Sequence, residues 1–373
     1  MPRPPAILQV LPALVSGGVE RGTVEIAEAI AAAGYRSLVA SSGGKLVAEV
    51  ERAGGVHVTL PLDARSPGAI WRNASSLAAL VRAEDVAILH ARSRAPAWSA
   101  WLASRRTGAR FVTTYHGAYN EGFPGKRLYN SVMARGERVI AISRFIAELI
   151  QARHGTSRER IRMIPRGVDA RRFDPAAIPA ARVLALREAW GAAPGSKMIL
   201  LPGRLTRWKG QVVLVEAMAR LPDAVGVLAG GGGEAFARQL RERAEALGLG
   251  PRLVFAGHVE AMDMALLAAD VVVHASTDAE AFGRTVIEAQ AMARPVVASD
   301  LGGPRETVKD GVTGWRVPPG DPAALATALS RVLAMPDSAR KAVGAAARAA
   351  VLRDYTTEAM QRATIAVYRE LLP

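Results

Sequence analysis

Short runs of apolar, β-branched residues alternate along the chain with longer stretches in which apolar residues recur every three or four positions. This alternation is typical of β-α-β units, whose strands pair in parallel sheets. One helix is expected at 19–33, where Gly34 provides a stop. The expected strands form two series: 7–11, 37–40, 57–60, 86–89, 111–114, 139–142 and 161–164, then 198–201, 225–229, 253–256, 271–274, 296–298 and 314–317. The pattern therefore predicts an α/β protein with two doubly wound, Rossmann-like domains, which we expect to face each other across a cleft.

The chain length supports two domains, since 373 residues exceed the size at which one hydrophobic core usually stops growing. The link is expected at 165–181, which is rich in Pro, Arg and Asp and lacks periodicity. We thus expect an N-terminal domain over 1–181, a second domain over 182–354 and a final helix within 355–373. One face of that helix carries Ala359, Ala363, Val367 and Leu371.

The loop at 203–210 follows the buried strand at 198–201 and precedes a helix expected at 211–221. In open parallel sheets, ligands bind outside the carboxyl ends of the strands. Arg204 and Lys209 lie on this loop. Arginine can fork onto phosphate oxygens, and lysine supplies a point charge. Two cations at a helix start predict an anion site, with ordinary solvated side chains as the alternative.

The segment 280–288 follows the strand at 271–274 and opens a helix that reaches about residue 292. Glu280 lies on the turn, and Glu288 lies within the helix. The amides of 283–286 are the donors of a helix N-terminus, suited to a phosphate or sugar oxygen. Glu288 could be a solvated helix residue, but its apolar neighbours indicate a covered helix, where an unpaired carboxylate is costly.

Glycine turns follow two of the expected strands. Gly17 and Gly18 begin the first helix, and Gly231 lies in the glycine run after 225–229, where the backbone can approach a ligand. The G-x-G-x-x-G spacing is absent, and no acidic residue ends the second strand, so a nicotinamide enzyme is disfavoured. His116 directly follows a strand and is a candidate for that reason, although a lone histidine is more often structural. No histidine pair has metal-ligand spacing, so we expect no metal site.

The charge is distributed unevenly. The formal net charge is +14; residues 1–182 carry 26 Lys and Arg against 14 acidic residues (+12), and the remainder carries 22 against 20 (+2). A basic first half predicts an anionic partner, either phospholipid or nucleic acid, with an arginine-rich genome as the alternative. The stretch with Lys126, Arg127 and Arg135 is the expected contact with anionic lipid or a charged acceptor. Trp98 and Trp101 are expected to face the core.

The lack of cysteines and of a long apolar run bears on the expected cellular location. There are no cysteines, which excludes a disulfide scaffold and thiol catalysis and suits a reducing compartment. No run of about 18 apolar residues could span a bilayer. We therefore expect a cytoplasmic protein, peripheral on the inner face of the membrane where its basic half meets lipid.

Several motifs occur together along nearly the whole chain. They are E-x7-E (Glu280 to Glu288), G-R-L…K-G (203–210), I-P-x-G-V-D (164–169), F-x-G-x-V (255–259) and P-V-V-A-S-D-x-G-G-P-x-E (295–306), with G-G-V-E-R and H-G in the first half. On these motifs the chain resembles the retaining glycosyltransferases of family 4, the group 1 glycosyl transferases with the two-domain GT-B fold. The resemblance implies transfer of a sugar from a nucleotide-diphosphate sugar to an acceptor, without a metal or other cofactor.

The resemblance also implies roles by position. Catalytic roles fall on His116, Arg204, Lys209 and Glu280. Donor-binding roles fall on Gly17, Gly18, Arg166, Gly231, Val259, Phe282, Gly283, Arg284, Thr285 and Glu288. Arg204 and Lys209 would grip the diphosphate, with Glu288 on the ribose. Glu280 would bind the sugar beside His116, the backbone at Val259 would meet the base, and the final helix would cross back onto the first domain.

Two positions depart from the family pattern. Arg166 stands where Asn is common, and Arg284 stands where an aliphatic residue is usual, so either arginine could add a contact to an anionic group. The acceptor is expected to be a lipid-linked or lipopolysaccharide-type glycan. The donor base and the transferred sugar stay open between uracil, guanine and adenine sugars.

Two other functions compete with sugar transfer. A nucleotide-sugar epimerase or a phosphorylase could use the same fold, and an epimerase would convert the donor without any acceptor. A basic nucleic-acid-binding protein is suggested by net charge alone. No recognised nucleic-acid-binding module accompanies that charge. Nucleic-acid binding would also leave the glycine-rich strand ends unexplained.

Overall fold

The computed structural model describes residues 3–15 and 17–372. Its contacts divide the chain into two compact units, Met1–Arg166 with Thr357–Pro373, and Gly167–Thr356. The division thus falls at Arg166, inside the expected link at 165–181 and ahead of the domain bound placed at residue 181. The segment after Arg166 belongs to the second unit because it is tied to α14 (Asp337–Asp354) and its C-cap: Val168 N–H donates to the Tyr355 carbonyl at 2.9 Å, and Arg348 binds the Asp174 carboxylate at 3.0 Å.

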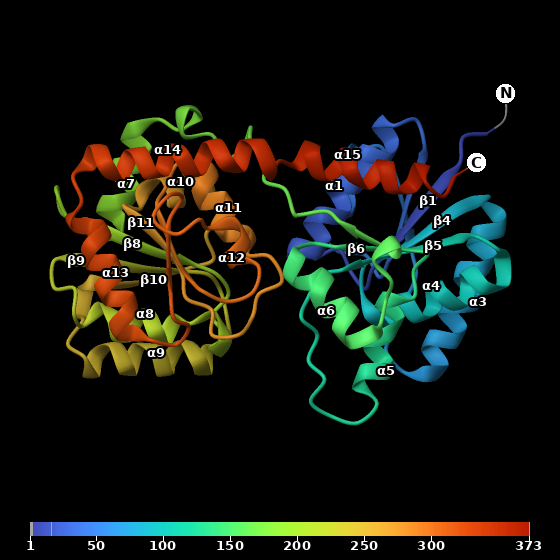
Figure 1. The fold of residues 1–373 in the computed structure, drawn as a ribbon, viewed down its shortest axis with the longest axis horizontal. Coiled ribbons are helices and arrows are strands. Elements are labelled where there is room, and N and C mark those ends of the chain that lie inside the picture. The colour runs from blue at the N-terminus through green and yellow to red at the C-terminus, as the bar shows by residue number, and fades with distance from the viewer. Residues whose placement is uncertain (1–2, 16, 373) are drawn as a thin grey trace. The chain divides into compact units, whose positions relative to one another are not determined.

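The first unit is built on a parallel seven-stranded sheet with the order β3-β2-β1-β4-β5-β6-β7 (Figure 1). Its strands are β1 Ala6–Val10, β2 Arg36–Ser41, β3 Gly55–Thr59, β4 Val86–Ala91, β5 Arg110–Tyr115, β6 Arg138–Ala141 and β7 Ile161–Met163. Its helices are α1 Gly18–Ala32, α2 Val47–Arg52, α3 Pro67–Ala83, α4 Arg94–Thr107, α5 Lys126–Ser131, α6 Arg144–His154 and α15 Thr357–Arg369, with short 3-10 turns η1 Val132–Ala134 and η2 Arg158–Arg160.

The last helix, α15, packs beside α1 in this unit. It buries Met360, Ile365, Val367 and Tyr368 in one cluster with β-strand residues and with Ile26 and Ile30 of α1. Of the face noted in the sequence, Val367 is buried in this cluster, Ala363 and Leu371 pack against it, and Ala359 is half-buried. The larger Met360 and Tyr368 side chains remove more apolar surface from water than the alanines, and they therefore contribute more to the docking of the helix.

The second unit holds a parallel six-stranded sheet with the order β10-β9-β8-β11-β12-β13. Its strands are β8 Lys197–Pro202, β9 Ala224–Ala229, β10 Leu253–Gly257, β11 Val271–His274, β12 Val296–Ser299 and β13 Trp315–Val317. Its helices are α7 Ala180–Ala189, α8 Gln211–Met218, α9 Glu234–Ala246, α10 Met262–Ala268, α11 Arg284–Ala291, α12 Pro304–Thr307, α13 Pro322–Ala334 and α14, with 3-10 turns η3 Pro175–Ala177, η4 Arg207–Lys209 and η5 Gly250–Arg252.

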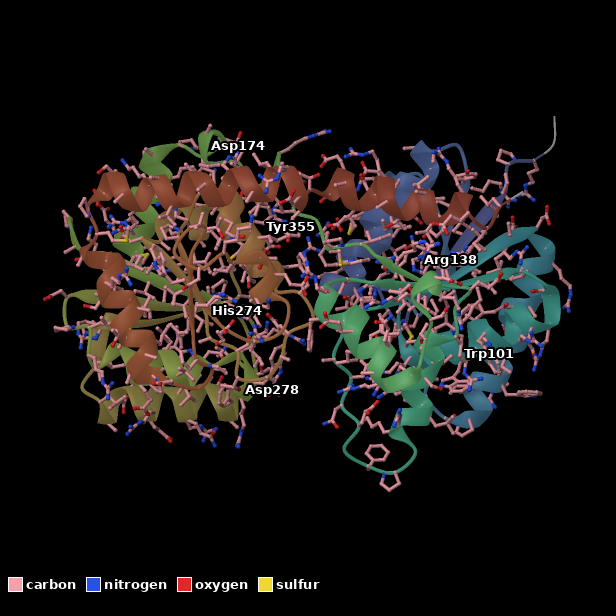
Figure 2. The ribbon with its side chains drawn as sticks, in the orientation of Figure 1. Trp101, Arg138, Asp174, His274, Asp278 and Tyr355 are labelled. Carbon is pink, nitrogen blue, oxygen red and sulfur yellow. The ribbon has the colours of Figure 1, made fainter. Side chains whose placement is uncertain are left out.

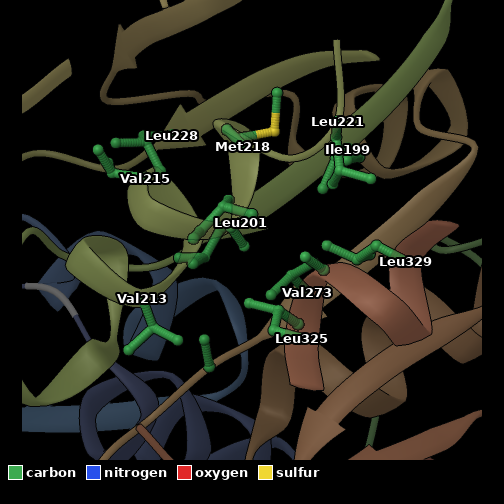
Figure 3. Packing of buried hydrophobic residues seen from close by; sticks show 14 of the residues in the cluster. Ile199, Leu201, Val213, Val215, Met218, Leu221, Leu228, Val273, Leu325 and Leu329 are labelled. Atoms are coloured by element: carbon green, nitrogen blue, oxygen red, sulfur yellow. The ribbon is translucent and has the colours of Figure 1, made fainter. Parts of the chain in front are cut away.

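The core of this unit lies between the sheet and the helices that cover it. Ile199 and Leu201 of β8 and Val273 of β11 pack with Leu214 of α8 and Leu329 of α13, as the close-up in Figure 3 shows for most of them. Strands buried on both faces read as continuous apolar runs. Every expected strand is present with ends that differ by one or two residues, and the α/β fold class is confirmed. Among the described residues, none of the helices combines the length and apolar character needed to cross a bilayer.

Candidate functional site

The loop after β8 lies against the loop after β11 in the second unit. Gly210 has φ +75°, and a Cβ placed there would come within 1.8 Å of the Ala275 carbonyl oxygen. The Trp208 carbonyl accepts a hydrogen bond from Thr277 N–H at 2.8 Å. Only glycine permits this approach of two backbones. This contact places η4, which contains Lys209, beside the residues that follow β11.

Lys209 and His274 both bind the Glu280 carboxylate. Lys209 Nζ donates to Glu280 Oε1, and His274 Nε2 lies in hydrogen-bond contact with Glu280 Oε2. The three side chains are 16%, 5% and 13% exposed, respectively. His274 is the last residue of β11 and lies inside the second unit (Figure 2). The structure therefore brings the two candidate residues Lys209 and Glu280 together, and His274 joins them.

The environment of Glu280 keeps its carboxyl group ionised. Burial by itself raises the pKa of Glu280, because a charged carboxylate loses hydration. The charge and hydrogen bond of His274, followed by those of Lys209, outweigh burial and hold the pKa at about 2. Near neutral pH, Glu280 is consequently an anion that only accepts hydrogen bonds, so the shared hydrogens belong to His274 Nε2 and Lys209 Nζ.

The backbone at Glu280 is held by the turn after β12. Gly303 N–H donates to the Glu280 carbonyl at 2.8 Å. A Cβ at Gly302, whose φ is +65°, would lie 2.4 Å from that carbonyl oxygen, and a Cβ at Gly303 would lie 2.4 Å from Phe282 Cα. The paired glycines thus explain the G-G-P motif: they let this turn press on the Glu280 turn and fix it.

Helix α11 starts directly after the turn that holds Glu280. Gly283 is its N-cap with φ +83°, and Phe282 is buried with its ring edge-on to Tyr355 at 5.7 Å. The Val286 amide is not an available donor, since it binds the Gly283 carbonyl at 3.0 Å. Thr285 is half-buried in the first turn. One of the four amides that were expected to receive a ligand, that of Val286, therefore donates to the chain's own backbone instead.

Arg284 and Glu288 lie one turn apart on α11. Arg284 Nε is 3.6 Å from Glu288 Oε1, and the two side chains are 19% and 15% exposed. The arginine at this unusual position thus lies beside a carboxylate of its own helix. Glu288 is a largely covered anion with a cation nearby, as expected for a carboxylate that is not merely solvated.

The other predicted residues of the second unit are placed more loosely. Arg204 is exposed after β8, Val259 is half-buried, and Gly231 is exposed with open space where a Cβ would be. The close approach in the glycine run falls on Gly230, whose Cβ would lie 2.0 Å from the Gly203 carbonyl oxygen. The approach of the Gly231 backbone to a ligand stays a prediction, and the neighbours of Gly231 make the tight backbone contacts within the chain.

Arg166 lies at the start of α1 in the first unit. It is 4% exposed, its guanidinium donates to the Gly18 carbonyl, and it lies 3.9 Å from Met360 Sδ. A Cβ at Gly22 would come within 2.1 Å of the guanidinium, so this glycine makes the room. Gly17, with φ +133°, is the N-cap of α1, and Ser16 before it lies outside the described residues.

His116 lies near a second buried cation, Arg92, which follows β4. The Nε2 atom of His116 is buried and has no hydrogen-bond partner among the described residues. Burial lowers the pKa of His116 well below its ordinary value, and the nearby charges of Arg92 and Arg166 lower it further. Arg92 is 2% exposed and donates to Gln9 Oε1 at 3.0 Å. The sequence marked His116 by its place after a strand, and Arg92 occupies the corresponding place after β4.

The basic stretch of the first unit divides into exposed and packed residues. Arg127 is exposed and Lys126 half-buried, with the Lys126 ammonium 4.6 Å from the centre of the Phe123 ring. Arg135 instead lies over the rings of Trp98 and Trp101, at 5.1 and 4.6 Å. Both tryptophans are half-buried, so they face this segment more than the core. Arg135 is thus a packing residue, because its guanidinium is covered by aromatic faces.

Comparisons with known proteins match both units. The model of the glycosyl transferases group 1 matches residues 184–350, and the model of glycosyltransferase family 4 matches residues 16–172. The crystal structure of a glycosyltransferase from Rickettsia africae ESF-5 is 34% identical, covers 99% of this chain and 98% of its own, and has a TM-score of 0.90. The chain belongs to the group 1, family 4 glycosyltransferases.

The curated relatives match less of this glycosyltransferase chain. A D-inositol 3-phosphate glycosyltransferase from Xylanimonas cellulosilytica is 39% identical over 229 residues, which are 60% of this chain and 54% of the relative. The chain spans about half the length of the curated relatives it matches. HepE of Anabaena, solved with UDP-glucose, is 23% identical, covers 98% of this chain and 100% of its own, and with a TM-score of 0.86 shares the GT-B fold.

Within this family's fold, the described site of the second unit gathers around the E-x7-E segment. The structure brings Glu280, Lys209 and His274 together, and places the Arg284–Glu288 pair on the helix that follows. The sequence offered one signal for His274, a polar residue that ends an apolar strand. Among the described residues, no group of three His, Asp or Glu side chains is arranged to hold a metal ion.

Proposed function

We propose that this chain is a retaining glycosyltransferase that moves a sugar from a nucleotide-diphosphate sugar to an acceptor. The observation that carries the proposal is the ionised Glu280 carboxylate, bound by Lys209 and His274 beside the start of α11. A buried anion with exchangeable partners suits polar hydroxyl groups, and a cation on a glycine-flanked loop suits a diphosphate. Membership in the glycosyltransferase family supports the same reading.

The proposed chemistry depends on the charge of the leaving group. As the glycosidic bond breaks, negative charge grows on the nucleoside diphosphate, and Lys209 and Arg204 stabilise it electrostatically. Glu280 holds the sugar hydroxyls while an oxocarbenium-like transition state forms. Glu288 binds the ribose. The acceptor hydroxyl attacks from the face that the diphosphate leaves, and the departing phosphate takes its proton, so configuration is retained without a metal.

A ligand panel followed by product analysis tests this proposal. Thermal shifts with UDP, GDP, ADP and their glucose forms should show one base that raises the melting temperature, because a ligand that binds only the folded state stabilises it. With that donor and a glycan acceptor, NMR of the new linkage should show the donor's anomeric configuration, and EDTA should leave the rate unchanged. A sugar converted without an acceptor would instead identify an epimerase.

We further propose that the acceptor is an anionic or lipid-linked glycan met at a membrane surface. The curated relatives include enzymes named for D-inositol 3-phosphate, an anionic acceptor. Around α5, Phe123 and Leu128 are 60% and 63% exposed beside Lys126 and Arg127, which joins apolar and cationic groups on one segment. Such a segment suits the interface of an anionic bilayer.

Vesicle sedimentation tests the membrane proposal. The chain should sediment with vesicles that contain phosphatidylglycerol and less with pure phosphatidylcholine vesicles. A Lys126→Gln, Arg127→Gln double variant should lose that preference, while Arg135→Gln, whose guanidinium is covered by Trp98 and Trp101, serves as the matched control. Equal binding to both vesicle types would contradict an electrostatic contact.

A further inference from the structure

The two oxygens of the Glu280 carboxylate have partners of different character. Lys209 reaches Oε1 at the end of a four-carbon stem, and its Nζ also lies 4.6 Å from the centre of the Trp208 ring. His274 reaches Oε2 with a short, rigid side chain that is 5% exposed. Its backbone belongs to β11 and pairs with Ala298 of β12, so the sheet fixes the base of this short, buried side chain. Lys209 therefore has more freedom to move than His274.

The movable partner has a second task under the proposed function. The Lys209 ammonium is a compact point charge, and a diphosphate carries more negative charge than one carboxylate. When the donor binds, Lys209 is drawn to the phosphates, and Glu280 Oε1 becomes available to a sugar hydroxyl. A largely buried carboxylate that loses its last partner is strongly disfavoured, so something must hold the other oxygen.

We propose that His274 is a positioning residue that holds the Glu280 carboxylate in place while Lys209 leaves it for the donor diphosphate. This inference rests on the proposed function. His274 Nε2 donates to Oε2 throughout, and Ser276 Oγ lies 3.4 Å from the same nitrogen. His274 Nδ1 is buried without a hydrogen-bond partner among the described residues, so the polar contacts of this ring are made through Nε2, and the one with Glu280 is the shorter. The donor sugar then meets a carboxylate that is already oriented.

The charged groups that act on Glu280 come from two elements. His274 comes from β11 and Lys209 from η4, while the Gly302–Gly303 turn contributes backbone alone. When His274 is removed, Lys209 remains the one described cation on this carboxylate. The acid limb of kcat/KM should then move to higher pH, since burial favours the protonated form of a carboxyl group.

Two substitutions of His274 separate its hydrogen bond from its charge. His274→Leu removes the donor, and His274→Gln keeps an N–H near the position of Nε2. We expect His274→Leu to bind UDP, GDP or ADP, whichever the wild type prefers, within about twofold of wild type by calorimetry. Its affinity for the matching nucleotide-glucose should fall about tenfold or more, as for a lost hydrogen bond to a charged group. His274→Gln should keep most of the sugar affinity and show the raised acid limb.

The outcomes distinguish this inference from the proposed function. A His274→Leu protein that keeps wild-type affinity for the nucleotide-glucose and an unmoved acid limb would overturn the positioning role. If His274→Leu does not fold, His274→Gln decides, and an acid limb identical to that of wild type would contradict the inference. Failure of the wild-type chain to bind any nucleotide would contradict the proposed function itself, and the role of His274 with it.

Discussion

In the second unit, side chains of opposite charge meet beyond the carboxyl ends of β8 and β11, whereas in the first unit the residues after β4 and β7 include two buried arginines. Lys209 and His274 bind the Glu280 carboxylate directly. Arg92 and Arg166 instead donate to the Gln9 side chain and the Gly18 carbonyl. Lys209 thus holds a charged partner that a ligand can exchange, whereas the buried arginines of the first unit donate to groups of their own chain.

This difference predicts how substitutions in each region affect turnover and stability. A charge pair at the carboxyl edge of a sheet can open for an anion, because the ligand replaces the partner that is lost. A cation solvated by its own chain has no such substitute, so a change there acts on folding. We therefore expect substitutions around Glu280 to change turnover and substitutions in the first unit's buried polar cluster to change stability.

The largest effect is expected for Lys209→Ala. It removes a cation that stabilises the developing charge of the leaving group, and kcat should fall about 10²–10³-fold, as for the loss of one preorganised transition-state donor. His274 still binds Glu280, so the melting temperature should change little. Arg207→Ala, an exposed cation on the same turn, is the control and should turn over normally. Near-normal turnover of Lys209→Ala would remove Lys209 from the site.

A smaller effect is expected when a methyl group is added to the turn that clamps Glu280. The Cβ of Gly303→Ala would lie 2.4 Å from Phe282 Cα, so the backbone must shift, at about 1–3 kcal/mol of unfolding free energy. Gly231→Ala is the matched control, because its Cβ meets nothing within 4 Å. Chemical denaturation compares the two. Equal stabilities of Gly303→Ala and Gly231→Ala would show that the Gly302–Gly303 turn can shift without cost, and that it does not fix Glu280.

The same contrast explains what the sequence could and could not predict. The strands were predictable because buried parallel strands leave continuous apolar runs, and Glu280 and Lys209 were predictable because they occupy strand-end loops. His274 looked like the end of an apolar strand, and its contact with Glu280 involves a backbone that the Gly302–Gly303 turn, from a distant loop, holds in place. The position of the boundary within the expected link at 165–181 was not predictable for a similar reason, since Arg348 and Tyr355, far along the chain, hold the segment that follows Arg166.

Acid should lower the stability of the first unit more than that of the second. The pKa values of His90 and His116 are lowered by burial first, so these side chains stay unprotonated when folded but take up protons near pH 6.5 when unfolded. The first unit should thus lose about 1.4 kcal/mol of unfolding free energy per histidine for each pH unit below about 6.5. Glu280, with a pKa of about 2, contributes stability that is lost only as pH falls from its unfolded value, roughly 4.3, toward 2.

Hydrogen exchange measures this difference at pH 7.5, 6.5 and 5.5, after correction for the intrinsic exchange rate. Protection of β4 and β5 should fall over this range, and protection of β8 and β11 should hold. The variant His90→Asn, which carries no titrating ring, should flatten the response of the first unit. A parallel loss of protection in both units would mean that the buried histidines do not set its acid sensitivity.

The smallest effect is expected at the hydroxyl that ties α15 to β4. Tyr368 Oη lies 2.6 Å from His90 Nδ1, and His90 Nε2 lies 2.7 Å from Thr114 Oγ1, so one neutral imidazole links the last helix to two strands. Tyr368→Phe leaves Nδ1 buried without a partner and should cost about 1–2 kcal/mol. Tyr35→Phe, a half-buried tyrosine in the same core, is the control and should cost nearly nothing. If both variants melt alike, α15 is held by its apolar face alone; if only Tyr368→Phe is weaker, the polar residues of the first unit serve the docking of its last helix.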